Sequence, residues 1–179
     1  MEETNQVERR AAGIKLLLMD CDGVLTDGTL TLLEGGDEQK SFHSRDGQGI
    51  VLLHRGGLQA GIISGRNSTA VTRRAHELGM NLELVRQGSR DKVRDFEEIL
   101  ALARVEATDV AFIGDDVTDA PLMQRSQLAV AVADAVEETR AVAHYVTRHP
   151  GGHGAVREVC ELILKAQGRW PELMRQYFD

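Results

Sequence analysis

Two aspartates separated by one residue follow the first strongly apolar stretch of the chain. The stretch 16–19 reads Leu-Leu-Leu-Met, and Asp20, Cys21 and Asp22 come directly after it. A short apolar run of this kind is typical of a buried strand, and open α/β sheets bind ligands at the carboxyl ends of their strands. The spacing therefore indicates a catalytic or metal-binding pair, although an isolated Asp-x-Asp is more often a turn or a helix cap.

Polar residues also follow two later apolar runs. Ser64 ends one of them, Asp115 and Asp116 follow another, and Lys92 stands at the start of a predicted helix. In a parallel sheet these strand ends lie on one edge, so we expect the side chains to meet there. Each position alone has an ordinary explanation as a turn, a capping loop or a solvated charge. All four in order, each at a predicted element boundary, favour one shared site.

The residue types of this predicted site suit phosphoryl transfer. Clustered carboxylates raise one another's pKa unless a cation lies among them, and oxygen-rich sites of this kind suit Mg²⁺. An ammonium from Lys92, a hydroxyl from Ser64 and nearby backbone N–H groups would bind a phosphate. One carboxylate could attack phosphorus to give an aspartyl-phosphate, while a second acts first as acid and then as base.

Strands and helices are predicted to alternate along the chain. Apolar runs predict strands at 14–19, 58–63, 82–85, 110–113, 128–132 and 145–147. Helical patterns are predicted at 50–53, 67–78, from Ser89 or Arg90 to 103, 121–123, 136–143 and 155–165, with an extension through 170–178. This alternation favours an α/β fold in which a parallel sheet carries helices on both faces.

The segment 24–43 predicts a β-hairpin placed over the carboxyl end of the first strand. Its turn chemistry falls at 34–37, and 38–43 reads as the returning strand. With 179 residues the chain suits one domain, 1–179, and one of that size buries about 70% of its unfolded surface. We treat 1–12 as a polar leader and 168–179 as a C-terminal tail.

The composition excludes several classes of protein. Hydrophobic residues make up 42% and charged residues 27%, which is ordinary for a soluble globular chain, and the net charge of −7 argues against a nucleic-acid partner. No apolar run is long enough for a membrane span, and the N-terminus lacks the apolar core of a signal peptide. Cys21 and Cys160 do not make a disulfide framework. We expect a cytoplasmic protein with a small-molecule partner and a Cys21 side chain in the core.

Four segments resemble the motifs of the haloacid dehalogenase superfamily of phosphatases. The segment 20–28, DCDGVLTDG, is similar to their first motif, 63–66 (ISGR) to the second, Lys92 to the third and 114–119 (GDDVTD) to the fourth. The resemblance extends over about 14–164. It implies a three-layer, Rossmann-like fold with a hairpin flap and Mg²⁺ as the cofactor.

Within that superfamily, three further segments are similar to the small phosphatases that act on 3-deoxy-D-manno-octulosonate 8-phosphate. These are 44–50 (SRDGQGI), Gln87-Gly88 and 147–158 (TRHPGGHGAVRE). That family lacks a cap domain, and its hairpin assembles a homotetramer in which neighbouring subunits close the active sites. The resemblance therefore implies a homotetramer acting on a phosphorylated 2-keto-3-deoxy sugar acid.

The resemblance also implies a role for each matched residue. Asp20 would be the nucleophile and a metal ligand, Asp22 the general acid and base with its backbone carbonyl on the metal, and Asp115 a direct metal ligand. Asp116 or Asp119 would orient metal-bound water. The phosphoryl group would be held by Ser64, Lys92 and the backbone N–H groups of Gly23 and Gly65. The sugar-acid end would face Arg45, Asp46, Gly47, Arg66 and Arg74.

Departures from the family pattern leave alternatives open. Val51 stands where relatives often carry Lys or Arg, and His43-Ser44 stands where they often carry Asn-Val. A nonulosonate 9-phosphate or another small phosphometabolite is therefore a second candidate substrate. A third hypothesis is a non-catalytic accessory subunit. The intact catalytic set argues against it, because a pure scaffold has no need of clustered charge that costs stability.

Overall fold

Six strands form one parallel sheet in the computed structural model, which describes residues 2–35 and 38–178. The strand order is β5-β4-β1-β6-β7-β8, and every neighbouring pair is parallel. The strands of this sheet are β1 (Leu16–Met19), β4 (Gln59–Ile63), β5 (Val85–Arg86), β6 (Val110–Gly114), β7 (Leu128–Ala131) and β8 (Tyr145–Val146). The parallel sheet expected from the sequence is confirmed.

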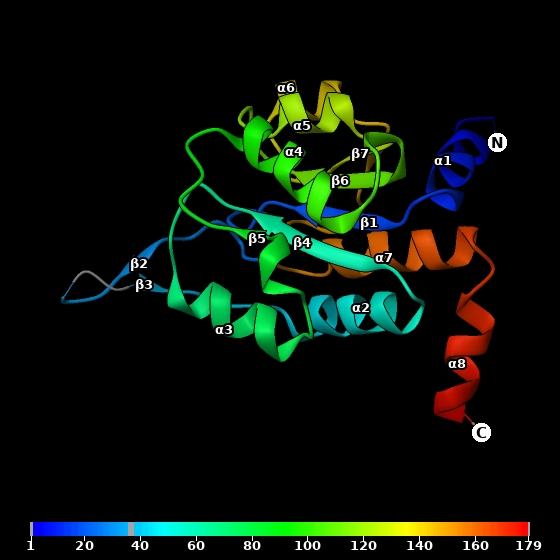
Figure 1. Cartoon of the computed structure of the whole chain (residues 1–179), viewed down its shortest axis with the longest axis horizontal. Helices are drawn as coiled ribbons and strands as arrows, with labels where there is room; N and C mark the ends of the chain where they lie inside the picture. Colours follow the sequence, from blue (N-terminus) through cyan, green and yellow to red (C-terminus); the bar gives the residue numbers. More distant parts are fainter. Residues whose placement is uncertain (1, 36–37, 179) are drawn as a thin grey trace.

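Helices cover both faces of the sheet (Figure 1). One face carries α2 (Ser44–Arg55), α3 (Thr69–Glu77) and α7 (Ala155–Ala166); the other carries α4 (Lys92–Ala103), α5 (Ala120–Arg125) and α6 (Glu137–Ala141). Right-handed crossovers explain the division, because α2 and α3 connect strands running toward β5 while α4, α5 and α6 connect strands running toward β8. The three-layer α/β prediction is therefore confirmed. Within the described residues, no helix is both long enough and apolar enough to cross a membrane.

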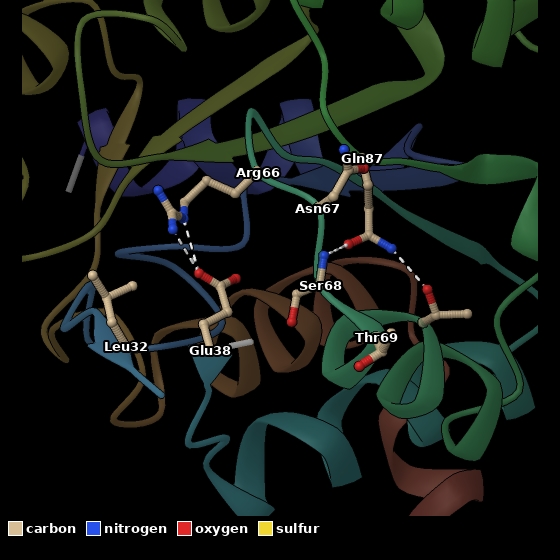
Figure 2. Close-up of a pocket in the computed structure, with 8 residues that line it drawn as sticks. Leu32, Glu38, Arg66, Asn67, Ser68, Thr69 and Gln87 are labelled. Atoms are coloured by element: carbon tan, nitrogen blue, oxygen red, sulfur yellow. Dashed lines mark hydrogen bonds and ion pairs between the residues drawn. The ribbon is translucent and has the colours of Figure 1, made fainter. Parts of the chain in front are cut away.

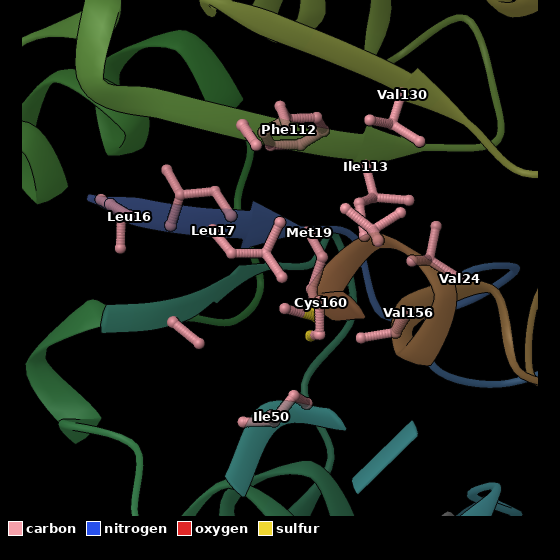
Figure 3. Packing of buried hydrophobic residues seen from close by; sticks show 14 of the residues in the cluster. Leu16, Leu17, Met19, Val24, Ile50, Phe112, Ile113, Val130, Val156 and Cys160 are labelled. Carbon is pink, nitrogen blue, oxygen red and sulfur yellow. The ribbon is translucent and has the colours of Figure 1, made fainter. Parts of the chain in front are cut away.

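The core is built around β1, the strand that carries the first aspartate. All four of its side chains are fully buried, because β1 lies between β4 and β6 and is covered on both faces. Figure 3 shows Met19 close to Val156 and Cys160 of α7, with Phe112 of β6 on the other side. A strand buried on both faces reads as a continuous apolar run, which explains the sequence signal. Cys21 is fully buried as expected, and its burial raises the pKa of the thiol.

The N-terminal segment is more ordered than a polar leader. Glu2–Ala12 forms α1, in which Ala11 is buried and Val7 packs against the core. The Gln167 side chain at the end of α7 donates hydrogen bonds to the carbonyls of Ala11 (3.3 Å) and Ile14 (2.7 Å). Two small apolar residues one turn apart give too weak a helical periodicity for the sequence to indicate this contact. At the other end of the chain, Trp170–Phe178 forms α8 with Leu173 buried.

Several predicted boundaries are wrong, and three of them have a clear local cause. The strand predicted at 82–85 is a 3₁₀ turn over Leu82–Leu84 followed by β5, because Asn81 Oδ1 accepts a hydrogen bond from the Glu83 N–H and starts a turn. Helix α2 begins at Ser44, earlier than predicted, since its two early glycines lower the helical signal. Helix α4 begins at Lys92 with Asp91 as its N-cap, so Ser89 and Arg90 precede it.

The hairpin projects from the carboxyl edge of the sheet, at the end opposite to both chain termini (Figure 1). Among the described residues of 24–43, the antiparallel ladder consists of β2 (Thr31–Leu32) and β3 (Glu38–Gln39), so the paired part is shorter than predicted there. Part of the turn expected at 34–37 lies outside the described residues. The hairpin nevertheless returns directly beside the end of β1, which brings Lys40 to the site described next.

Candidate active site

The carboxyl ends of three adjacent strands open into one cavity of about 730 Å³. Asp20 follows β1, Ser64 follows β4 and Asp115 follows β6, and β1 pairs with both of the other strands. Lys92, the first residue of α4, lines the same cavity. The fold thus brings together all four positions that the sequence indicates.

Asp20 is held tightly at the floor of this cavity and is only 8% exposed. Its Oδ1 accepts a hydrogen bond of 2.7 Å from the Cys21 N–H, and its Oδ2 lies 3.1 Å from Lys92 Nζ. Burial and the neighbouring Asp119 carboxylate raise the pKa of Asp20 to about 6, against the opposing effect of Lys92. One carboxylate oxygen is therefore fixed by backbone, while the other faces a cation.

Asp115 and Asp119 complete a cluster of carboxylates with Asp20. One oxygen from each residue lies within 4.8 Å of the other two. Burial, followed by repulsion from Asp119 and Asp20, raises the pKa of Asp115 to about 7. Asp119 is fully buried; it accepts hydrogen bonds from Lys92 Nζ (2.8 Å) and from the Asp115 N–H (3.1 Å). Asp116 lies outside this cluster, and its Oδ1 accepts a bond from the Val117 N–H.

The cluster fits a divalent cation. Asp115 Oδ1 is buried without a hydrogen-bond partner, which is costly unless an ion or water satisfies it. Three carboxylates share a single buried ammonium, Lys92, so negative charge is left uncompensated. Hard oxygen donors of this kind are the ligands that Mg²⁺ prefers. Asp20 and Asp115, both predicted as metal ligands, belong to this cluster. The ligand predicted for Asp22 is its backbone carbonyl, and its side chain pairs with Lys40.

The two oxygens of Asp22 have different surroundings. Oδ1 accepts a hydrogen bond from Lys40 Nζ of the hairpin and a longer one, 3.4 Å, from the Thr26 hydroxyl. Oδ2 is buried and has no hydrogen-bond partner. The side chain lines the same cavity as Asp20. Asp22 is thus a carboxylate with one oxygen anchored by an ammonium and the other buried without a hydrogen-bond partner.

The opposite wall of the cavity presents groups that suit a phosphate. Ser64 and Gly65 line it, and the Ser64 Oγ accepts a bond of 3.3 Å from the Arg66 N–H. Burial disfavours the charged ammonium of Lys92, but Asp119 and Asp20 outweigh this and raise the pKa of Lys92. Gly23 has a positive φ of +84°, and a Cβ there would collide with the Asp115 carboxylate. Only glycine therefore allows the first loop to approach the cluster so closely.

The five residues expected at the sugar-acid end do not share one place. Arg66 lines the catalytic cavity, and its guanidinium binds Glu38 Oε2 of the hairpin at 2.7 Å (Figure 2). Arg45 lines a separate cavity of about 570 Å³. Asp46 is buried and accepts hydrogen bonds from the backbone N–H groups of residues 154 and 157, at 3.0 and 2.8 Å. Gly47 packs directly against the Arg74 guanidinium.

Lys40 and Glu38 are site residues that sequence reasoning missed. Both side chains are nearly inaccessible, 3% and 8% exposed, and they form an ion pair of 3.0 Å next to Asp22. The alternating pattern of the hairpin predicted strands, yet it could not show which charges fold back onto the sheet edge. The Thr26 hydroxyl beside Asp22 was missed for the same reason, because its segment reads simply as a turn.

Comparisons with known proteins agree with this geometry. A family model described as haloacid dehalogenase-like hydrolase matches residues 66–159. The 3-deoxy-D-manno-octulosonate 8-phosphate phosphatase of Yersinia pestis is 45% identical over 165 residues, covering 92% of this chain and 87% of the relative. The enzyme of that name from Escherichia coli strain K12 is 41% identical over 167 residues, covering 93% of this chain and 88% of its own length.

Solved structures give the same picture. The 3-deoxy-D-manno-octulosonate 8-phosphate phosphatase of Moraxella catarrhalis, in complex with a magnesium ion, a phosphate ion and a KDO molecule, superimposes with a TM-score of 0.92. It is 39% identical and covers 97% of this chain and 98% of its own. The Y. pestis structure gives a TM-score of 0.90 at 44% identity, covering 93% of this chain and 89% of its own. This chain belongs to the haloacid dehalogenase-like hydrolases.

Proposed function

We propose that this protein is a Mg²⁺-dependent phosphatase that hydrolyses 3-deoxy-D-manno-octulosonate 8-phosphate to the sugar acid and phosphate. The observation that carries the proposal is the buried Asp20 carboxylate, which lies 3.1 Å from Lys92 in a cavity shared with Asp22 and Asp115. Relatives that are 41–45% identical over most of their length bear the name of this phosphatase, which supports the choice of substrate.

Asp20, Asp115 and the backbone carbonyl of Asp22 would hold the cation, with Asp119 or Asp116 orienting its water. When bound, Mg²⁺ supplies positive charge that offsets the repulsion between the carboxylates and the substrate phosphate. Lys92 and Ser64, aided by backbone N–H groups at Gly23 and Gly65, would orient the phosphoryl oxygens. These contacts present phosphorus to Asp20, whose position is fixed by a backbone N–H and by the Lys92 ammonium.

The reaction divides into two displacements at phosphorus. In the first, an Asp20 oxygen attacks phosphorus, the ester P–O bond breaks, and protonated Asp22 gives its proton to the leaving sugar oxygen. In the second, a water molecule attacks the aspartyl-phosphate while Asp22 accepts a proton from it. The bond between phosphorus and Asp20 then breaks, which releases phosphate and restores Asp20 as a carboxylate and Asp22 as an acid.

The test is a phosphatase screen against a panel of sugar phosphates, with and without Mg²⁺. We expect release of phosphate to require Mg²⁺ and kcat/KM to be highest for 3-deoxy-D-manno-octulosonate 8-phosphate. Absence of turnover for every phosphate ester would reject the proposal and favour the accessory-subunit hypothesis. If the protein hydrolyses a generic aryl phosphate and the activity is lost in Asp20→Asn, the accessory-subunit hypothesis is rejected instead.

A related nonulosonate 9-phosphate is the second candidate substrate, and Val51 is the observation that favours it. Val51 is a partly buried residue of α2 that packs against the core, so it offers no cation to the substrate carboxylate. Of the five residues predicted to face the sugar-acid end, Arg66 is the basic one that lines the catalytic cavity. A higher kcat/KM for the nine-carbon ester than for the eight-carbon ester would support this alternative.

We also propose a homotetramer assembled through the hairpin, working in the cytoplasm. Support comes from Leu30, Leu32 and Leu33, which are 48%, 72% and 48% exposed on this projecting arm, because exposed apolar patches mark association surfaces. Both cysteines are free and buried, as suits a reducing compartment. Light scattering after gel filtration measures the assembly. A tetramer that Leu32→Asp converts to smaller species would support it, and a monomeric wild-type protein would reject it.

A further inference from the structure

Lys40 lies directly behind the proposed acid–base residue. It follows β3 of the hairpin, its side chain is 3% exposed, and its ammonium contacts both Asp22 Oδ1 and Glu38 Oε1. Lys40 is absent from the residues that line the catalytic cavity. Its contacts with residues that do line the cavity are a direct one with Asp22 and an indirect one, through Glu38, with Arg66.

The Lys40 contact distinguishes the two oxygens of Asp22. Lys40 and the Thr26 hydroxyl both approach Oδ1, whereas Oδ2 is buried with no partner. A carboxylate rotates about its Cβ–Cγ bond unless one oxygen is anchored, and a proton is transferred efficiently only from a correctly placed atom. Anchoring Oδ1 therefore fixes the plane of the Asp22 carboxyl, a residue that lines the cavity, and with it the place from which a proton is given or taken.

Glu38 holds Lys40 in this position. One of its carboxylate oxygens lies 3.0 Å from Lys40 Nζ, and the other accepts two bonds from the Arg66 guanidinium, at 2.7 and 3.0 Å (Figure 2). Burying an ammonium and a carboxylate is costly, and apolar residues of similar size would fasten a hairpin to the protein at least as well. The charged pair therefore points to a role beyond attaching the arm.

We propose that Lys40 is a positioning residue, which anchors Asp22 Oδ1 and so holds the Asp22 carboxyl in the orientation that proton transfer to the phosphate ester requires. The inference rests on the proposed phosphatase function and adds a residue from outside the superfamily motifs. In the first displacement the proton moves from the Asp22 carboxyl to the leaving oxygen as the ester P–O bond breaks. In the second, the Asp22 carboxylate takes a proton from the attacking water as the bond between phosphorus and Asp20 breaks.

The test uses two leaving groups, because only one of them needs a proton from Asp22. A p-nitrophenolate leaves without protonation, whereas the alkoxide of an alkyl or sugar phosphate does not. In single-turnover measurements we expect Lys40→Met to slow release from the alkyl ester by about 100-fold, and release of p-nitrophenolate by less than about threefold. Steady-state hydrolysis of the aryl ester should show a burst of p-nitrophenolate, because the misplaced Asp22 activates water poorly in the second displacement.

Three variants make the result specific. Lys40→Arg keeps the cation and should recover part of the alkyl-ester rate. Glu38→Gln keeps Lys40 but leaves it with one charged partner, Asp22. We expect this variant to slow release from the alkyl ester by about tenfold, with a smaller loss on the aryl ester. Gln39→Ala, on the exposed side of the same strand, is the matched control and should leave both rates unchanged.

Equal losses on the two esters in Lys40→Met and Glu38→Gln would overturn the inference, because they indicate that the pair only attaches the hairpin. Unchanged rates in both variants would overturn it as well. If Lys40→Met does not fold, the ratio of the two rates in Glu38→Gln decides between these outcomes. A wild-type protein that hydrolyses neither ester would instead remove the proposed function, and this inference with it.

Discussion

The carboxylate cluster at the end of β1 and the single carboxylate of Glu158 differ sharply in how their negative charge is compensated. At the end of β1, Asp20, Asp115 and Asp119 share one ammonium, and burial with mutual repulsion raises the pKa values of Asp20 and Asp115 to about 6 and about 7. On α7, Glu158 stands alone among donors. Burial would raise its pKa, but hydrogen bonds from its neighbours outweigh burial and lower the pKa to about 2.

The donors around Glu158 show what a structural carboxylate looks like. It accepts hydrogen bonds from the Tyr145 hydroxyl (2.5 Å), from His149 Nδ1 (2.6 Å) and from the Arg148 N–H (3.1 Å). Its lone pairs are satisfied within the protein, and the charge stabilises the fold. Asp115, by contrast, keeps a buried oxygen without a partner. The difference teaches that unsatisfied negative charge, rather than burial, marks the group that is built to bind a cation.

Asp20→Asn should produce the largest effect. The amide keeps the size of the side chain and an oxygen that can accept the Cys21 N–H, but it cannot attack phosphorus. We expect phosphate release to fall by about four orders of magnitude or more. Thermal stability should hold or rise in metal-free buffer, because one repelling charge is removed. Wild-type turnover by this variant would show that Asp20 is not the nucleophile.

Glu158→Gln should affect stability rather than chemistry. The variant loses a charge that is satisfied by several donors, so we expect the free energy of unfolding to fall by about 2 kcal/mol after allowance for solvent screening. The folded pKa is about 2, below its unfolded value, so this stabilisation is present above about pH 4.5 and is lost as pH falls toward 2. Denaturant unfolding at pH 7 and pH 3 measures it. An equal deficit at both pH values would contradict the assignment.

The smallest expected effect is the change in thermal stability with pH and with added Mg²⁺. Because the folded pKa values of Asp20 and Asp115 are raised, the native state binds more protons than the unfolded state between about pH 4 and pH 7, so metal-free stability should fall as pH rises through that range. Adding Mg²⁺ at pH 7.5 should raise Tm by about 3 °C or more. Asp115→Asn should reduce that increase, and Glu158→Gln should keep it. An equal rise in Tm on addition of Mg²⁺ in both variants would show that the cluster at the end of β1 does not bind the cation in preference to Glu158.

The sequence predicted the parallel sheet and the meeting of Asp20, Ser64 and Asp115 in one cavity for a common physical reason. Strands buried on both faces appear as continuous apolar runs, and polar residues that end such runs, among them Asp20 and Ser64, must lie at one sheet edge. Local signals of this kind need no knowledge of distant contacts. The sequence did not predict helix α1, because its apolar residues Val7 and Ala11 form too weak a pattern on their own and are covered only by packing against the rest of the fold.

Residue types and their order along the chain were therefore sufficient to determine the fold class, the carboxylate pair and the chemistry those groups support. Tertiary structure decided the charge pairs that the sequence left open or did not indicate. It placed Asp119 rather than Asp116 with Asp20 and Asp115, buried Asp46 beneath the start of α7, and turned Lys40 onto Asp22. The reason is that electrostatic and hydrogen-bond partners depend on distances of a few ångströms between segments far apart in sequence, and no periodicity along the chain encodes those distances.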